Sequence, residues 1–302
     1  MQARQLLRAV ALLWLAMTAA PRPACAQDVT ARQIVVSGAE AGEEFEDPGG
    51  YGQPEWAERS RASATTKLYV LSPFEVFFGF VSESDFLRHG STAHDLTQEI
   101  EVGLPFRLEL DLENHVGLAG GRAGESEASA GVRYAFAAWG RISLNPTISA
   151  NYIFSADDAP PDRFEQARSR RHSDGYELRI LLGQEFVPQW QWASNIFFQR
   201  EFSGGRNQRV GFTQDVAYLA IADKLELGAE MRYTHAARRE RDAANEFVVG
   251  PSINWKANFY TVVSLAPLFG CTADSPRVAI LATVSLEFGG GESKTAKSRA
   301  AR

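Results

Sequence analysis

The stretch Phe106–Glu113, FRLELDLE, alternates apolar and charged residues without interruption, with every even-numbered residue apolar and every odd-numbered residue charged. A period of two is that of a β-strand, in which successive side chains point to opposite faces. The pattern predicts a strand with one apolar and one charged face. It leaves open whether the leucines face a protein core or lipid, and that choice separates a soluble sheet from a membrane barrel.

The same alternation recurs along the chain and predicts an all-β protein with twelve strands. No amphipathic helix that would cover a sheet is evident in the sequence. Two prolines, Pro146 and Pro251, fall within expected strands, where each removes a ladder donor, so we expect bulges there. The expected strands are 67–81, 94–103, 106–117, 126–136, 141–154, 174–186, 189–202, 209–221, 225–235, 245–255, 258–269 and 277–288.

The lengths of the expected connections favour a membrane barrel. The connections after even-numbered strands are short, such as LP and VP, whereas those after odd-numbered strands are longer, such as SADDAPPDRFEQARSRRHS. Bacterial outer-membrane barrels have short periplasmic turns and longer external loops. Backbone groups in lipid must be paired within the protein, so such a sheet closes on itself. We therefore predict a closed antiparallel up-and-down transmembrane β-barrel.

The first residues resemble an export signal. Arg4 and Arg8 precede the apolar run 9–17, and the sequence ACA ends at Ala26. A basic region, a short apolar region and an A-x-A site are typical of a signal peptide. We predict cleavage near Ala26 and localisation in the bacterial outer membrane. Cleavage removes three arginines and no acids, which takes the formal net charge from −6 to −9, so a nucleic-acid partner is not expected.

Composition divides the rest of the chain. Residues 27–66 are rich in Gly, Glu, Ala and Ser and are expected to form a flexible periplasmic leader or a plug. Residues 67–288 are expected to form the barrel, and residues 289–302 a disordered tail. Within the leader, Ile34, Val35 and Val36 resemble the box by which energised receptors contact TonB, which makes TonB a candidate partner.

Several phrases together resemble a family of uncharacterised bacterial outer-membrane barrels. These barrels are grouped with transporters and phenol-degradation-pathway barrels. The resemblance covers residues 67–289, supports the fold and the location, and implies only a transport-like role. It is carried by EIEVGLPFRLELDLEN, GVRYAFAAWGRISLNPTISANYIF, ELRILLGQEFVPQWQWASNIFFQREF, DKLELGAEMRY, VGPSINW and LAPLFGCTADSP.

If the apolar faces meet lipid, the charged faces line a common lumen. This lumen is either a polar, acid-leaning channel or a salt-bridged core that fills the barrel; twelve strands lie between the filled and the open sizes. The candidate lumen-lining residues are Glu99, Glu101, Arg107, Glu109, Asp111, Glu113, Glu127, Arg133, Glu177, Arg179, Glu185, Glu201, Glu226, Glu230, Arg232 and Glu246.

The sequence does not point to an enzyme. His172 and Ser173 are adjacent, so a strand would turn them to opposite sides, and His89, His94 and His115 lack metal-ligand spacing. We therefore expect no catalytic residue, no cofactor and no metal site. The expected partners are membrane lipid, lipopolysaccharide facing the arginine-bearing loops, and the outer-membrane assembly machinery, which would recognise a final strand ending in Phe288.

The predicted function is a channel or transporter for small polar or organic solutes. Three alternatives stay open at this point. The first is a structural or surface-binding barrel with a closed, salt-bridged lumen. The second is a TonB-coupled uptake barrel, and the third is a soluble secreted β protein.

Overall fold

The computed structural model describes residues 51–52, 61–88, 92–119, 122–155, 174–187, 189–202, 207–221, 224–238, 241–258 and 260–288. The expected export signal, the TonB-box-like residues Ile34, Val35 and Val36, and the C-terminal tail lie outside these residues. No helix in the described part of the chain is long and apolar enough to span a membrane.

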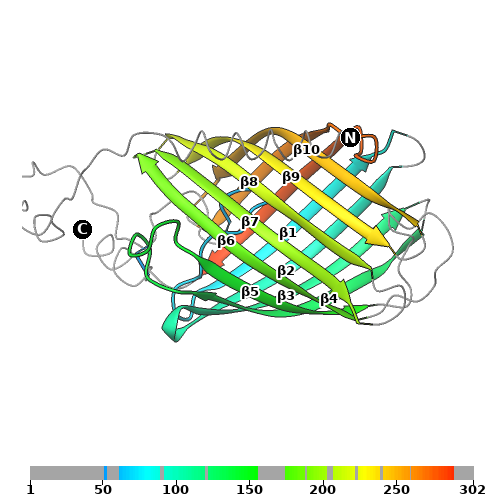
Figure 1. Cartoon of the computed structure of the whole chain (residues 1–302). Helices are drawn as coiled ribbons and strands as arrows, with labels where there is room; N and C mark the ends of the chain where they lie inside the picture. Colours follow the sequence, from blue (N-terminus) through cyan, green and yellow to red (C-terminus); the bar gives the residue numbers. More distant parts are fainter. Residues whose placement is uncertain are drawn as a thin grey trace, which may run out of the picture. The chain divides into compact units, whose positions relative to one another are not determined.

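The described residues form a closed antiparallel barrel of twelve strands, as predicted (Figure 1). Each strand pairs with its neighbours in the chain, and β1 pairs with β12 in unbroken register from Val76↔Phe288 to Phe86↔Val278. Closure leaves no sheet edge with unpaired backbone groups. The strands are β1 (Val76–Phe86), β2 (Ala93–Leu104), β3 (Leu108–Ala119), β4 (Arg122–Ala135), β5 (Thr147–Ser155), β6 (Gly175–Val187), β7 (Trp190–Glu201), β8 (Gln208–Ile221), β9 (Leu225–Arg238), β10 (Arg241–Lys256), β11 (Thr261–Gly270) and β12 (Val278–Phe288).

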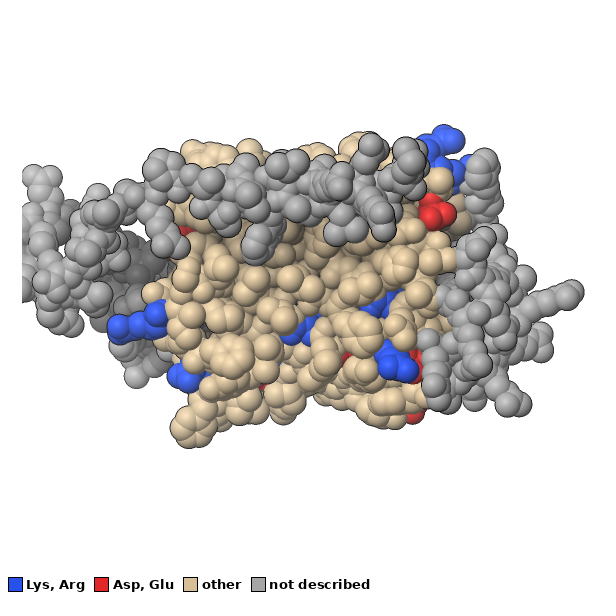
Figure 2. All heavy atoms as spheres, viewed as in Figure 1, with Lys and Arg blue, Asp and Glu red and all other residues tan. Residues whose placement is uncertain are grey.

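The two faces of the strands have opposite chemistry. Leu110 and Leu112 of β3 point outward and are 44% and 53% exposed, whereas Glu109 and Asp111 point inward and are 0% and 2% exposed. A soluble sheet would bury the leucines and expose the acids. The barrel does the reverse, and on the face shown in Figure 2 charged side chains are sparse.

Exposed aromatic side chains cluster near the strand ends. At the end where β1 starts and β12 finishes, which we call the turn end, Tyr260 stacks on Phe288 with ring centroids 5.7 Å apart, and Trp190 packs on Tyr218. At the opposite end, the loop end, Tyr152 packs on Phe202. Aromatic girdles of this kind flank the apolar band of membrane barrels.

Several predicted boundaries are wrong. The first strand starts at Val76 rather than at residue 67, because residues 67–75 lie inside the barrel. Phe106 and Arg107 belong to the short 3-10 turn Pro105–Arg107 with positive φ angles, not to β3. The fifth strand starts at Thr147 rather than at 141, since Leu144 and Asn145 also have positive φ, which β-strands do not accommodate.

The expected loop lengths are correct only in part. Two connections predicted to be long are replaced by strand: β3 ends at Ala119 and β4 starts at Arg122, while β9 ends at Arg238 and β10 starts at Arg241. Polar, Gly-rich and Arg-rich sequence still forms backbone ladders when a hairpin extends beyond the apolar band. The alternation of short and long connections predicted the correct topology, although the lengths of individual connections were wrong.

The two strand prolines do not produce the expected bulges. Pro146 precedes β5, and Pro251 pairs with Ala229 of β9 in continuous register. On its other side, the pairing of β10 with β11 is interrupted between Val249 and Ile253, in a register that places Pro267 opposite. Pro251 and Pro267 both lack an N–H to donate. The ladder between β10 and β11 therefore loses hydrogen bonds at this position, but no extra residue bulges out of either strand.

Candidate functional site

A chain segment before β1 occupies the barrel interior. Residues 61–75, which we call the luminal segment, enter from the turn end and reverse in a tight turn in which the Ala62 N–H donates to the carbonyl of Thr66 at 2.8 Å. Arg61 and Lys67 form an isolated antiparallel bridge below this turn. Twelve residues of the segment are buried, including its charged ones. The segment therefore fills space that the barrel wall leaves.

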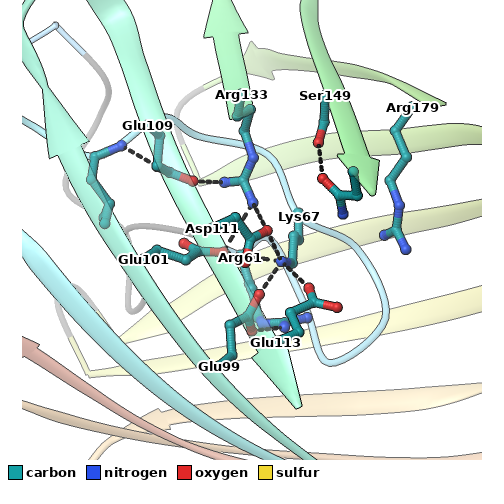
Figure 3. Close-up of polar contacts among 12 residues, drawn as sticks. Arg61, Lys67, Glu99, Glu101, Glu109, Asp111, Glu113, Arg133, Ser149 and Arg179 are labelled. Carbon is teal, nitrogen blue, oxygen red and sulfur yellow. Dashed lines mark hydrogen bonds and ion pairs between the residues drawn. The ribbon is translucent and has the colours of Figure 1, made fainter. Parts of the chain in front are cut away.

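The Lys67 ammonium lies among four carboxylates of β2 and β3, which we call the acidic cradle (Figure 3). Its Nζ is 2.7 Å from Glu113, 2.8 Å from Asp111 and 3.1 Å from Glu101, and it also pairs with Glu99. The register explains the convergence, since Glu99 faces Glu113 and Glu101 faces Asp111 across the two strands. Like charges directly opposite one another repel unless a cation lies between them.

Arg133 of β4 braces the cradle from the side. Its guanidinium contacts Glu101 at 2.9 Å and Glu109 at 2.7 Å, and it donates to the carbonyl of Tyr69 at 2.8 Å. Arg133 is 1% exposed. A planar guanidinium can hold two carboxylates and a carbonyl in fixed positions at once, so Arg133 orients the wall acids and also binds the luminal segment.

Polar contacts on the opposite wall fix the tip of the segment. Glu230 of β9 accepts hydrogen bonds from the Thr65 N–H at 2.9 Å and from its hydroxyl at 2.6 Å. The Thr66 hydroxyl meets that of Thr213 at 2.9 Å. Asn195 of β7 exchanges two hydrogen bonds with the backbone of Lys67. The segment is thus bonded to both sides of the lumen.

Glycines in the wall make room for the segment. A Cβ at Gly183 would lie 2.2 Å from Cδ1 of Leu68, and a Cβ at Gly103 would lie 2.0 Å from the carbonyl oxygen of Ser72. Leu68 also packs in a buried apolar cluster that includes Ala193 and Ala217 of the wall. Small residues on β2, β6, β7 and β8 therefore form the surface on which the segment rests.

Gly183→Ala is expected to loosen the luminal segment, because the new methyl group overlaps Leu68 and overpacking costs about 1–3 kcal/mol. The measurement is the maleimide labelling rate of a Ser63→Cys reporter at the buried tip, in a Cys271→Ser background that removes the exposed thiol. Shortening Leu68 to alanine makes room for the new methyl group. The double variant Gly183→Ala, Leu68→Ala should therefore label more slowly than the summed effects of the two single changes on the labelling rate would predict. Additive effects of the two changes would contradict direct contact between these positions.

The wall of the lumen carries a large excess of acidic over basic side chains. Among the described residues, eleven acidic side chains on the strands are buried, compared with one buried basic side chain on the strands, Arg133. The other two buried basic side chains, Arg61 and Lys67, belong to the luminal segment. The segment thus supplies cations to a wall that is otherwise poorly compensated.

Nearly all candidate lumen-lining residues face the lumen. Arg107 does not, because it lies in the turn after β2, where its Nε donates to the carbonyl of Ala135 at 3.0 Å. The half-buried members on the strands are Glu113, Glu127, Arg179, Glu185, Glu201 and Arg232. The buried members are Glu99, Glu101, Glu109, Asp111, Arg133, Glu177, Glu226, Glu230 and Glu246.

Towards the loop end, the lumen contains further ion pairs. Arg179 pairs with Glu177 along β6, and Arg232 of β9 pairs with Glu83 across the barrel. His115 lies 3.3 Å from Glu113, at the rim of the acidic cradle. These groups are more exposed than those around the luminal segment, so water reaches this half of the lumen more readily.

The sequence could not identify Arg61 and Lys67 as luminal cations. Arg61 falls in the expected leader and Lys67 at the start of the first expected strand, and neither leader composition nor strand alternation marks a buried cation there. The sequence also missed a contact between Ser84 and His94, which face each other across β1 and β2 with 2.9 Å between hydroxyl and Nδ1. In the described part of the chain, no acidic side chain orients this imidazole.

Three cradle acids, Glu99, Asp111 and Glu113, lie close enough to share a metal ion, but the Lys67 ammonium occupies that position.

Comparisons with known proteins concern the fold. No protein-family model and no curated protein matches the chain. Among solved structures, the KdgM porin aligns with a TM-score of 0.44 and 10% identity over 70% of this chain and 99% of that one. The NanC porin aligns with a TM-score of 0.45 and 10% identity, covering 71% and 98%. An outer membrane channel from Pseudomonas putida F1 aligns with a TM-score of 0.46 and 11% identity, covering 73% and 98%.

Proposed function

We propose that this protein is an outer-membrane channel for small solutes and that its luminal segment closes the pore. The observation that carries the proposal is that a separable chain segment, rather than the side chains of the barrel wall, fills the lumen between β2–β3 and β7–β9. A barrel with a purely structural role can fill its interior with side chains of its own wall. This wall instead presents glycines to the segment.

The outer surface supports the membrane location. Outward residues such as Leu110, Ile148, Leu178 and Leu227 are between 43% and 49% exposed, which would be costly in water for so large an apolar band. In lipid the same band is favourable, and the closed sheet leaves no unpaired edge. The placement among phenol-degradation-pathway barrels remains a proposal that rests on the sequence resemblance.

A barrel whose lumen is permanently closed is the second candidate. The observation that favours it is the dense network of buried ion pairs around Lys67 and Arg133. The two functions differ in one respect: a channel has a state in which the luminal segment leaves, whereas a structural barrel does not.

Removing residues 53–72 is expected to create a steady ionic conductance in planar bilayers, where the full chain is closed or opens rarely. The excision is geometrically mild, because Tyr51 donates to the carbonyl of Leu104 and Phe74 donates to the neighbouring carbonyl of Gly103. A short Gly-Ser linker can therefore rejoin residues 52 and 73. A shift in gel mobility on heating would establish that the shortened barrel is folded, and a folded barrel without conductance would contradict the proposal.

A further inference from the structure

The acidic cradle binds two cationic groups at once in the closed state. The Lys67 ammonium contacts one carboxylate oxygen of Glu99, and the Arg61 guanidinium contacts the other. The same ammonium reaches Glu101, Asp111 and Glu113 at 3.1, 2.8 and 2.7 Å. An ammonium has three donors and no acceptor, so a group of convergent carboxylates is the complementary environment.

The barrel wall itself fixes part of the cradle. Arg133 of β4 lies 2.9 Å from Glu101 and 3.6 Å from Asp111, and these contacts do not involve Lys67. The strand register fixes the backbone positions of all four cradle acids. A preorganised set of charges binds a ligand with little further ordering, so the vacated cradle is a built site for a cation.

A second acidic surface faces the same lumen across the segment. Asp215 of β8 and Glu230 of β9 are paired across the strands and are 1% and 0% exposed. Neither carboxylate oxygen of Asp215 meets a hydrogen-bond donor in the described part of the structure, and Glu230 accepts two hydrogen bonds from Thr65 at the tip of the segment. Buried carboxylates without donors are costly, so this wall also favours a cation once the tip of the segment is gone.

We propose that the open lumen binds organic cations that carry two amino groups, and that Lys67 and Arg61 are the chain's internal substitute for such a solute. The inference rests on the proposed channel function and names its solute class. In the closed state, the chain's own cations occupy the cradle. In the open state, a diamine takes their place between the four carboxylates, and the excess negative wall draws cations through the pore.

The test uses the barrel lacking residues 53–72 in planar bilayers, with cadaverine as the probe. A pore lined by one sign of charge raises the local counter-ion concentration, so the permeability of K⁺ should exceed that of Cl⁻ by about tenfold or more. Cadaverine added to one side should reduce the current, whereas the uncharged analogue 1,5-pentanediol should not. The same diamine should reduce the rare openings of the full chain.

The matched variants separate the cradle from general charge. The triple change Glu99→Gln, Asp111→Asn and Glu113→Gln should raise the half-blocking concentration of cadaverine by roughly tenfold or more, because charge-assisted hydrogen bonds to the probe are lost. Glu201→Gln, which removes a luminal acid on β7 outside the cradle, should leave this concentration nearly unchanged.

Each contrary outcome has a distinct meaning. A folded barrel without current would overturn the channel function, and with it the inference. A current that favours Cl⁻ over K⁺ would overturn only the inference, as would a block that the triple change does not weaken. Stronger block by Mg²⁺ than by cadaverine would overturn the assignment to organic cations.

Discussion

Lys67→Met is expected to shift the equilibrium of the luminal segment from the closed towards the open state by about two orders of magnitude or more. Methionine preserves the length of the side chain but leaves four cradle carboxylates without the ammonium that lies 2.7 to 3.1 Å from three of them. Removing one partner from a buried charge pair typically costs about 3–5 kcal/mol, and each 1.4 kcal/mol is a factor of ten. The segment therefore loses much of what holds it in the lumen.

Two measurements follow this shift in the full chain. The maleimide labelling rate of the Ser63→Cys reporter should rise, and the fraction of time for which the channel conducts should rise with it. Lys67→Arg keeps the positive charge. Its labelling rate and its conducting fraction of time should therefore stay much closer to the native values than those of Lys67→Met. Lys224→Met, which changes an exposed lysine in the turn between β8 and β9, should label at the native rate.

A reversible cross-link shows whether the luminal segment is the gate. Thr66 and Thr213 have hydroxyls 2.9 Å apart, which suits a disulfide after Thr66→Cys and Thr213→Cys. In the Lys67→Met, Cys271→Ser background, the oxidised protein should be silent and the reduced protein should conduct. Equal conductance before and after reduction would show that ions do not pass through the space that the segment occupies.

Leu112→Arg is expected to lower the free energy of unfolding in lipid vesicles by about 2–4 kcal/mol, because an arginine near the bilayer midplane loses its hydration. Leu112 is the fifth of the twelve residues of β3, on its outward face, and is 53% exposed. Leu118 is also outward, at 43% exposed, but lies next to the loop end. Leu118→Arg should therefore cost only about 0–1 kcal/mol.

Urea unfolding in vesicles of a single lipid measures both variants under the same conditions. The depth dependence is the discriminating feature, since a soluble protein offers no reason for two exposed leucines on the same strand face to differ in this way. Equal costs at Leu112 and Leu118 would show that the outer face does not lie in a bilayer.

The sequence by itself determined the fold class and the orientation of the faces. Alternation of the kind seen from Leu108 to Glu113 depends only on the period of a strand, so it predicted which residues share a face wherever the strand was correctly placed. The short–long rhythm of the connections predicted a closed barrel. Boundaries failed where positive φ angles at Phe106, Leu144 and Asn145 ended the strands, because such angles depend on turn geometry that local alternation does not report.

The tertiary structure decided what the charged face meets. Glu109 accepts a hydrogen bond from the Leu71 N–H at 2.7 Å and pairs with Arg133, so it belongs to a packed network rather than to a water-filled pore in this state. Arg133, 24 positions away, faces Glu109 through the pairing of β3 with β4, whereas Leu71, 38 positions away, reaches it only because the luminal segment lies inside the barrel. No local sequence pattern around Lys67 marks this lysine as buried. Its role arises because the register of β2 with β3 sets four carboxylates side by side, and the closed barrel encloses the luminal segment that brings one ammonium among them.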